Sequence, residues 1–214
     1  MKFSLAQRCF LEALGTALLA YTIGRVGSAD LNPFEQSIGI GLCLALLIHV
    51  IGRFSGAHFN PAVTLLLNHQ RFGQRAFKTA EGLIETGGYI AAQIVGALIG
   101  LALNPVSAGA GDFALDGLVP EVLFSLALYS LILRWSDEGR ICPFAQPLSG
   151  IVIGFGLGFL ALIGGLSQSG IYNPAIAIGL ASNGMSGVVT AIAGQLIAVV
   201  VLLVMTRSSS AAAH

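Results

Sequence analysis

Two copies of the tripeptide Asn-Pro-Ala stand in different halves of a mostly apolar chain and are its most informative polar feature. An asparagine directly before a proline favours a helix start, because the amide oxygen can cap backbone N–H groups and proline fits the first turn. A short apolar stretch follows each copy before polar residues return. Each tripeptide therefore predicts a short helix with an amide at its tip. The six residues are Asn60, Pro61, Ala62, Asn173, Pro174 and Ala175.

The composition places the chain in a lipid bilayer. Of its 214 residues 55% are hydrophobic and 9% are charged, whereas a soluble domain carries about 25% charged residues. Such a chain has too little polar surface to cover a soluble globule. The formal net charge of zero argues against a nucleic-acid partner.

Long apolar segments divide the chain into predicted membrane spans. At about 1.5 Å per residue, a helix of about 20 residues crosses a hydrocarbon core about 30 Å thick. Two shorter runs, 59–67 and 172–181, begin at the tripeptides and reach about halfway. Backbone that ends at mid-membrane must be buried in protein or line water, so these runs predict a cavity. The six longer segments are 9–24, 36–51, 86–103, 118–133, 147–166 and 187–205.

The basic residues predict the orientation of the chain. Nearly all of them precede the first segment, follow the sixth, or lie in the second-to-third and fourth-to-fifth connections. By the positive-inside rule these connections and both termini are cytoplasmic in the cell (inner) membrane. Only Arg25 falls on the other side, together with the acidic residues Asp30, Glu35, Asp112 and Asp116. The first short run therefore enters from the cytoplasm and the second from outside.

The two ends of the chain allow other interpretations. Lys2 and Arg8 precede an apolar run, as in a signal peptide, but Glu12 inside the run and the lack of a convincing cleavage site favour a membrane span. Residues 208–214 predict a disordered tail.

The duplication extends beyond the tripeptides and predicts an inverted repeat. Each half contains three spans, an odd number, so the second half is upside down relative to the first. The predicted channel domain covers 1–207, with repeats at about 1–104 and 118–207. Inverted repeats place their site at the repeat interface near the bilayer midplane. In order, Glu12, Asn60 and Gln93 recur as Glu121, Asn173 and Gln195.

The predicted site favours neutral solutes with hydroxyl groups. Two helix N-termini meeting at the midplane carry partial positive charge and free N–H groups, and they would repel a cation. Asn60 and Asn173 can offer amide N–H groups to a passing solute. No ring of carboxylates or carbonyls could replace the hydration shell of a cation. We therefore expect a passive channel, without enzymatic activity, metal site or cofactor.

Glu12 and Glu121 leave a second function class open. Charged residues inside spans often mark ion pathways, so either glutamate could be the titrating site of a coupled transporter. The alternative is a carboxylate that anchors irregular backbone by hydrogen bonds. An intramembrane enzyme would need a nucleophile with a base, or a metal cluster, where only amides are predicted.

Four motifs identify the chain with a known family. They are FLEALGT at 10–16, SGAHFNPAVT at 55–64, AQIVGA at 92–97 and YNPA at 172–175. In this order they resemble the aquaporins of the major intrinsic protein family, over nearly the whole chain. The resemblance implies an all-α membrane protein with six transmembrane helices and two re-entrant half-helices in an inverted repeat. It also implies a homotetramer with one pore per subunit, and it implies that Glu12 and Glu121 are buried and hold the loops before the half-helices.

The resemblance also places an outer selectivity filter, where this chain departs from the family pattern. Most aquaporins have an arginine directly after the second tripeptide, and this chain has Ile176. The other filter positions fall on Ile40, Ala161 and Gly170, or on Ile171 if the loop is shifted by one residue. This ring is apolar and, with small residues at two positions, is expected to be wide. Without the fixed charge, discrimination against larger neutral solutes should relax.

The missing arginine also favours a class of solute. A similar loss occurs in bacterial aquaglyceroporins associated with arsenic resistance, which pass trihydroxylated arsenic and methylated arsenicals. Glycerol facilitators usually keep the arginine and follow it with aspartate, whereas Ile176 is followed by Ala177. The resemblance therefore favours neutral metalloid hydroxides such as arsenite, methylated arsenicals, or small polyols such as glycerol, as well as water.

Two questions stay open at this point. An apolar neck can exclude water by dewetting, which would make the chain a water-selective or poorly conducting channel instead. His58 should face the cytoplasmic vestibule, where it either senses pH or forms an ordinary hydrogen bond.

Overall fold

The computed structural model describes residues 3–105, 117–137, 139–141, 147–164, 170–182 and 187–211, and for 207–211 it describes the backbone only. Within these residues the chain is helical and forms no strand. Each predicted apolar segment overlaps one observed helix, which confirms the all-α fold with six longer and two half-length helices. The helices are α1 (Leu5–Gly27), α2 (Pro33–Ser55), α3 (Pro61–Phe72), a 3₁₀-helix η1 (Gly73–Phe77), α4 (Ala80–Leu103), α5 (Leu118–Arg134), α6 (Ser149–Gly164), α7 (Pro174–Ser182) and α8 (Val188–Ala211).

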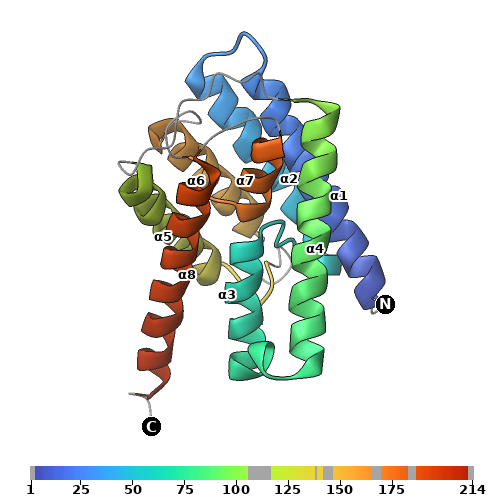
Figure 1. Cartoon of the computed structure of the whole chain (residues 1–214), viewed down its shortest axis with the longest axis vertical. Helices are drawn as coiled ribbons and strands as arrows, with labels where there is room; N and C mark the ends of the chain where they lie inside the picture. Colours follow the sequence, from blue (N-terminus) through green and yellow to red (C-terminus); the bar gives the residue numbers. More distant parts are fainter. Residues whose placement is uncertain are drawn as a thin grey trace.

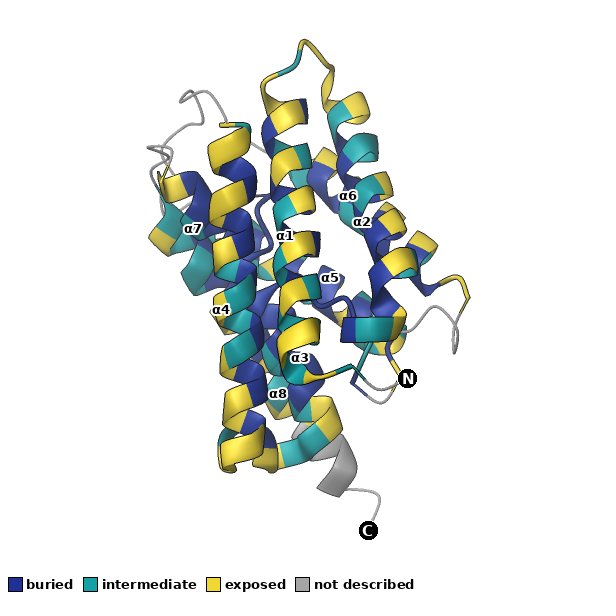
Figure 2. Cartoon of the chain, turned by 90° about the vertical axis from the view of Figure 1, so that its right-hand side faces the viewer, coloured by how far each residue is buried: buried dark blue, intermediate teal, exposed yellow. Residues whose placement is uncertain are grey.

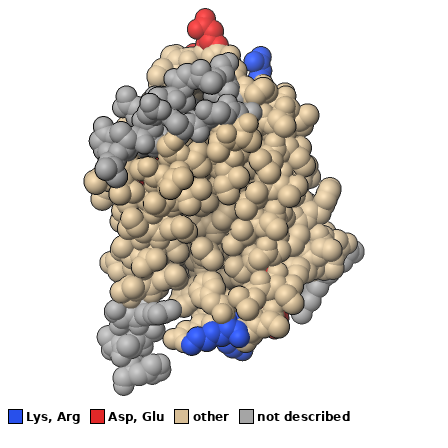
Figure 3. All heavy atoms as spheres, in the orientation of Figure 1, with Lys and Arg blue, Asp and Glu red and all other residues tan. Residues whose placement is uncertain are grey.

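The surface of the bundle suits a membrane. Helices α1, α2, α4 and the Val188–Thr206 part of α8 are long and apolar enough to cross a bilayer, while α5 and α6 are shorter, with 17 and 16 described residues. Large apolar side chains such as Phe10, Leu46 and Leu103 are exposed on outward faces. In Figure 3 the charged residues that are visible gather at the two ends of the molecule. The protein is therefore a multi-pass membrane protein.

The helices are arranged as two inverted halves (Figure 1). In each half the first helix packs on the last, α1 on α4 and α5 on α8, and α2 packs on α6 between the halves. Each short helix packs on the last helix of the other half, α3 on α8 and α7 on α4. From the middle of the bundle α3 and α7 run to opposite ends. Both chain termini lie at the end toward which α3 runs, called the terminal face below.

The loops that lead into the short helices lie in the core. Every residue from 55 to 64 and from 170 to 177 is buried, and Figure 2 shows these loops behind the half-exposed ribbons of α1 and α4. Irregular backbone at membrane depth is tolerated only where protein or water surrounds it, which is the environment that these loops have.

The ends of the predicted domain are only partly described. Helix α8 runs to Ala211, into the predicted tail at 208–214, while 212–214 and the connection at 106–116 with Asp112 and Asp116 lie outside the described residues. The first segment, for which a signal peptide is the alternative, forms α1 and packs along α4. The domain and repeat limits stay predictions.

Glycines let the long helices approach closely. A Cβ atom added to Gly100 of α4 would lie 2.8 Å from the Cβ of Ala20 and 2.9 Å from the backbone nitrogen of Tyr21, both on α1. A Cβ atom added to Gly41 of α2 would lie 2.6 Å from the carbonyl oxygen of Gly154 on α6. Small residues at such contacts allow tight packing in lipid, where the hydrophobic effect does not drive helix association.

We predict that Gly100→Ala lowers the thermal stability of the protein in detergent. The added methyl group has no room against α1, and overpacking of this kind costs about 1–3 kcal/mol. The matched control is Gly87→Ala on the same helix, where nothing lies within 4 Å of an added Cβ atom. Because alanine is the better helix former, Gly87→Ala should leave the melting temperature unchanged or raise it. Equal melting temperatures for the two variants would contradict this account.

Candidate functional site

The two asparagines cap the two short helices in the same way. Asn60 Oδ1 accepts hydrogen bonds from the backbone N–H groups of Ala62 and Val63, at 2.9 and 3.4 Å. Asn173 Oδ1 accepts the equivalent bonds, at 3.0 and 3.5 Å, from the residues two and three positions on. Each oxygen therefore satisfies helix-end N–H groups that have no partner within the helix.

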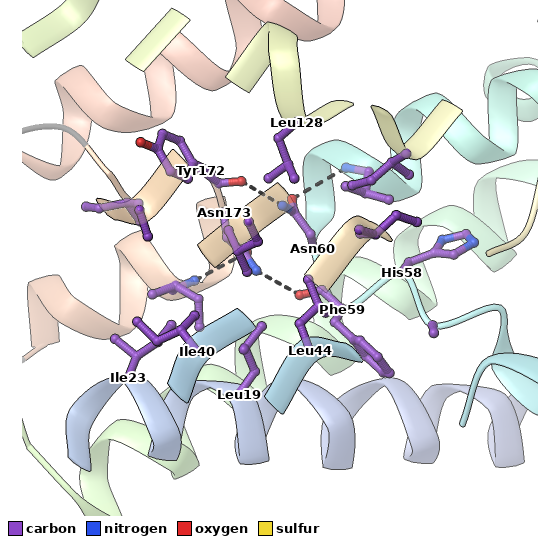
Figure 4. Close-up of a pocket in the computed structure, with 18 of the residues that line it drawn as sticks. Leu19, Ile23, Ile40, Leu44, His58, Phe59, Asn60, Leu128, Tyr172 and Asn173 are labelled. Carbon is purple, nitrogen blue, oxygen red and sulfur yellow. Dashed lines mark hydrogen bonds between the residues drawn. The ribbon is translucent and has the colours of Figure 1, made fainter. Parts of the chain in front are cut away.

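The amide nitrogens join the two halves reciprocally. Asn60 Nδ2 donates to the backbone carbonyl of Tyr172 at 2.7 Å, and Asn173 Nδ2 donates to the carbonyl of Phe59 at 2.9 Å (Figure 4). Each asparagine thus binds the residue that precedes the other. An amide nitrogen carries two hydrogens, and this bond uses one of them. The other remains available to a solute that passes the helix ends.

The backbone before each asparagine is held in an uncommon conformation. Phe59 and Tyr172 both have φ of +50°, a left-handed value that costs energy in residues with a side chain. This turn points the two carbonyls at the opposite amides. Tyr129 strengthens the second turn, because its hydroxyl donates to the Tyr172 carbonyl at 3.0 Å.

Glu12 holds the first turn with a full set of hydrogen bonds. Its side chain is fully buried. One carboxylate oxygen accepts from the Ser55 hydroxyl at 2.6 Å and the His58 N–H at 3.1 Å. The other accepts from the Phe59 N–H at 2.7 Å and the Gln93 amide at 2.8 Å. All four partners are donors, which matches an ionised carboxylate that can only accept.

Glu121 holds the second turn with fewer bonds. It is also fully buried, and its Oε1 accepts from the Tyr172 N–H at 2.8 Å and the Gln195 amide at 2.7 Å. Its Oε2 has no hydrogen-bond partner in the described part of the chain. The two halves are therefore similar in geometry but unequal in how well the anchoring carboxylate is satisfied.

The predicted filter and the asparagines come together around one cavity. Its volume is ≈ 50 Å³, which holds only a few water molecules. Besides both asparagines, Tyr172 and His58, the described lining residues are apolar, and Figure 4 shows Leu19, Ile23 and Leu44 on its wall. Both candidates for the uncertain loop position line it. The five predicted filter residues on the wall are Ile40, Ala161, Gly170, Ile171 and Ile176.

His58 lies in the wall of this cavity on the side of the terminal face. Its Nδ1 is 3.2 Å from the Thr64 hydroxyl, and its ring meets Tyr89 edge-on with centroids 5.1 Å apart. Its Nε2 has no hydrogen-bond partner in the described ranges. His58 therefore forms an ordinary hydrogen bond, while pH sensing stays a prediction.

Sequence reasoning missed several residues that line the pathway cavity, among them Ile141. It is 2% exposed, lines the cavity, and its N–H donates to the carbonyl of Gly56 at 3.1 Å. The connection between α5 and α6 brings it there through a tight turn, in which Gly139 has φ of +69°. Beside it, burial and then the positive charge of Arg71 lower the pKa of Arg140. The only hint in the sequence was a single isoleucine directly after Gly-Arg. The composition of this connection is otherwise typical of a polar surface loop.

Comparison with known proteins agrees with this geometry. A sequence profile described as major intrinsic protein matches residues 1–185. The chain belongs to the major intrinsic protein family. Its members are channels, so the protein is a passive membrane channel for water or small solutes and not an enzyme. Neither Glu12 nor Glu121 is among the described residues that line the cavity.

The relatives include channels of several names. The chain is 30% identical over 220 residues to a probable aquaporin of Archaeoglobus fulgidus, covering 84% of each chain. It is 30% identical over 186 residues to a glycerol uptake facilitator-like protein of Lactiplantibacillus plantarum, covering 78% of this chain and 80% of the relative. It is 37% identical over 110 residues to the aquaglyceroporin AqpS of Rhizobium meliloti. That match covers 48% of this chain and 44% of the relative.

We predict that Glu12→Gln destabilises the protein more than Glu121→Gln. A glutamine at position 12 must turn an NH₂ group toward donors, and each lost bond to a charged group costs about 1.5–3 kcal/mol. A glutamine at position 121 can keep both bonds at its oxygen and place the NH₂ group where Glu121 Oε2 has no partner. The measurement is the thermal unfolding midpoint of each purified variant. A Glu121→Gln midpoint as low as that of Glu12→Gln would contradict the difference between the halves.

Proposed function

We propose that the protein is a conduit for small neutral solutes with an apolar outer filter. The solutes are neutral metalloid hydroxides such as arsenite, methylated arsenicals, or small polyols such as glycerol, as well as water. Each subunit of a homotetramer has its own pathway. The terminal face, with both chain ends, is cytoplasmic in the cell (inner) membrane.

The observation that carries this proposal is the position of Ile176. It is 1% exposed, lies in the first turn of α7, and lines the cavity three residues after Asn173. A cationic, forked side chain there would offer several donors and a charge. Ile176 offers neither, and Ala161 and Gly170, which also line the cavity, are small. A site rejects a poorly fitting solute strongly when that solute leaves polar groups of the site without a hydrogen-bond partner. This filter has no such polar side chains, so it cannot reject a larger solute in this way.

The centre of the pathway supports neutral, hydroxylated solutes. The remaining N–H groups of Asn60 and Asn173 are donors, and the two helix N-termini add partial positive charge. Oxygen atoms of a hydroxyl group accept from such donors, while a cation is repelled. The printed names of two relatives, an aquaglyceroporin and a glycerol uptake facilitator-like protein, agree with polyols as one class.

The proposed orientation rests on the charges at the terminal face. Arg8 and Arg71 lie there, both bonded to Glu85 at 2.7 and 2.6 Å, together with the exposed Arg75. Figure 3 shows Lys and Arg at the lower end of the visible face, the end of the two termini. Basic residues near the ends of spans favour the cytoplasmic side.

We predict that Ile176→Arg narrows the range of solutes. In proteoliposomes followed by stopped-flow light scattering, uptake of glycerol and arsenite should fall about tenfold or more relative to water. Ile176→Leu, which keeps volume and apolarity, is the matched control and should keep the solute-to-water ratio of the parent. An Ile176→Arg variant that takes up glycerol and arsenite as fast as the parent, relative to water, would overturn the proposal.

A poorly conducting channel is the second candidate, favoured by the small volume and apolar wall of the cavity. A ring of apolar side chains around ≈ 50 Å³ can expel water and close the path without any moving part. In that case Ile176 would act as the barrier itself.

We predict that Ile176→Ser distinguishes the two candidates. A hydroxyl in a dewetted ring should raise water permeability about tenfold or more, because water gains a partner where it had none. In a ring that is already hydrated, the same change should alter water permeability less than twofold. Osmotic water permeability of proteoliposomes is the measurement, with Ile176→Leu again as the control. A large rise would support the closed state and count against the wide filter.

A further inference from the structure

A larger cavity lies outside the solute pathway, at the terminal face between α3, α5 and α8. Its volume is ≈ 570 Å³, and no residue that lines it also lines the pathway cavity. Helix α3 packs on both α5 and α8 here (Figure 1). We call this cavity the α3–α5–α8 groove. It is lined by Leu66, His69, Gln70, Gly73, Leu133, Arg134, Leu203 and Thr206.

The groove lies at one end of the apolar helices. The apolar, membrane-spanning part of α8 ends at Thr206, and α5 ends at Arg134. Leucines from all three helices form its apolar part. Its polar residues come from the ends of the same helices. A cavity with an apolar part at the depth of acyl chains and a polar rim at the depth of headgroups matches a lipid in shape and polarity.

The polar rim contains two exposed side chains that can donate hydrogen bonds, Arg134 and Gln70. Arg134 is exposed and has no ion-pair partner in the described ranges. The Gln70 side-chain oxygen accepts from the Ser136 hydroxyl at 2.8 Å, so the Gln70 amide nitrogen is left to donate elsewhere. His69 Nδ1 is buried without a hydrogen-bond partner in the described part of the chain. No described lining residue is acidic.

This donor set is selective for an anion with several oxygens. A guanidinium binds two oxygens of one phosphate with a planar pair of N–H groups, and an amide N–H can bind another. A free phosphate ion would use the rim only and leave the leucine-lined part exposed to water.

We infer that the α3–α5–α8 groove binds an anionic phospholipid, with the phosphate at Arg134 and Gln70 and an acyl chain along Leu133 and Leu203. The phospholipid belongs to the leaflet at the terminal face. This site is separate from the solute pathway, so the inference does not depend on which solute the channel passes.

A tryptophan next to the groove allows lipid binding to be followed by fluorescence. Trp135 is its single tryptophan, it follows Arg134 directly, and it is only half-buried. Phospholipids with brominated acyl chains quench tryptophan fluorescence on contact. The full-length protein is reconstituted in phosphatidylcholine vesicles that contain brominated phosphatidylglycerol or brominated phosphatidylcholine at equal mole fraction. We expect about a fivefold enrichment of phosphatidylglycerol beside Trp135, which corresponds to about 1 kcal/mol for one basic residue at the membrane surface.

Variants separate the groove from general surface charge. Arg134→Gln should abolish the preference for phosphatidylglycerol, and Gln70→Leu, which keeps the charge, should reduce it. Arg75→Gln removes an exposed arginine of the same face outside the groove and should keep the preference. Solute uptake at the parent rate shows that each variant is folded, because none of the three residues lines the pathway.

Three results would overturn the inference. Equal quenching by the two brominated lipids in the parent would show that the site does not select an anionic headgroup. Equal loss in Arg134→Gln and Arg75→Gln would show that surface charge alone attracts the lipid. Relief of quenching by inorganic phosphate at constant ionic strength, but not by sulfate, would assign the groove to a free phosphate ion.

Discussion

The reciprocal hydrogen bonds between the two half-helices are the constraint on which the rest of the structure depends. Asn60 donates to the carbonyl before Asn173, and Asn173 donates to the carbonyl before Asn60. The same two side chains cap their own helices through their oxygens. One asparagine in each half therefore joins the two halves, caps its own helix and presents a hydrogen-bond donor to the solute. Because neither half can form this contact alone, the inverted arrangement of the spans is what makes the site possible.

Holding two helix N-termini face to face requires compensation. Their partial positive charges repel each other, and the left-handed turns at Phe59 and Tyr172 cost about 1–3 kcal/mol each. The buried carboxyl groups of Glu12 and Glu121 offset the cost of the turns, since each accepts the N–H of one strained residue. Buried acidic side chains thus stabilise the irregular backbone, and neither of them is among the described residues that line the pathway cavity.

The features predicted from sequence are those that local rules or an internal duplication determine. Helix length follows from apolar runs, helix starts follow from Asn-Pro, and the pairing of Glu12 with Glu121 follows from the repeat. Ile141 and the α3–α5–α8 groove were not predicted, because they depend on how a connecting turn docks and on how three helix ends meet. The unsatisfied oxygen of Glu121 was not predicted either, since the sequence suggests that the two halves are alike.

In the function proposed above, the absence of a filter cation leaves a barrier to ions. None of the five residues of the proposed filter carries a charge, so exclusion of cations would rest on the two helix N-termini at Asn60 and Asn173 and on the apolar wall. No described residue that lines the cavity is a carboxylate, so an ion that entered would leave its hydration shell without a replacement, at a cost of several kcal/mol. A neutral hydroxylated solute meets donors at the centre and loses far less on leaving water. In the proposed filter, size discrimination and charge discrimination are therefore separable, because Ile176 in place of an arginine would relax the first while the helix N-termini retain the second.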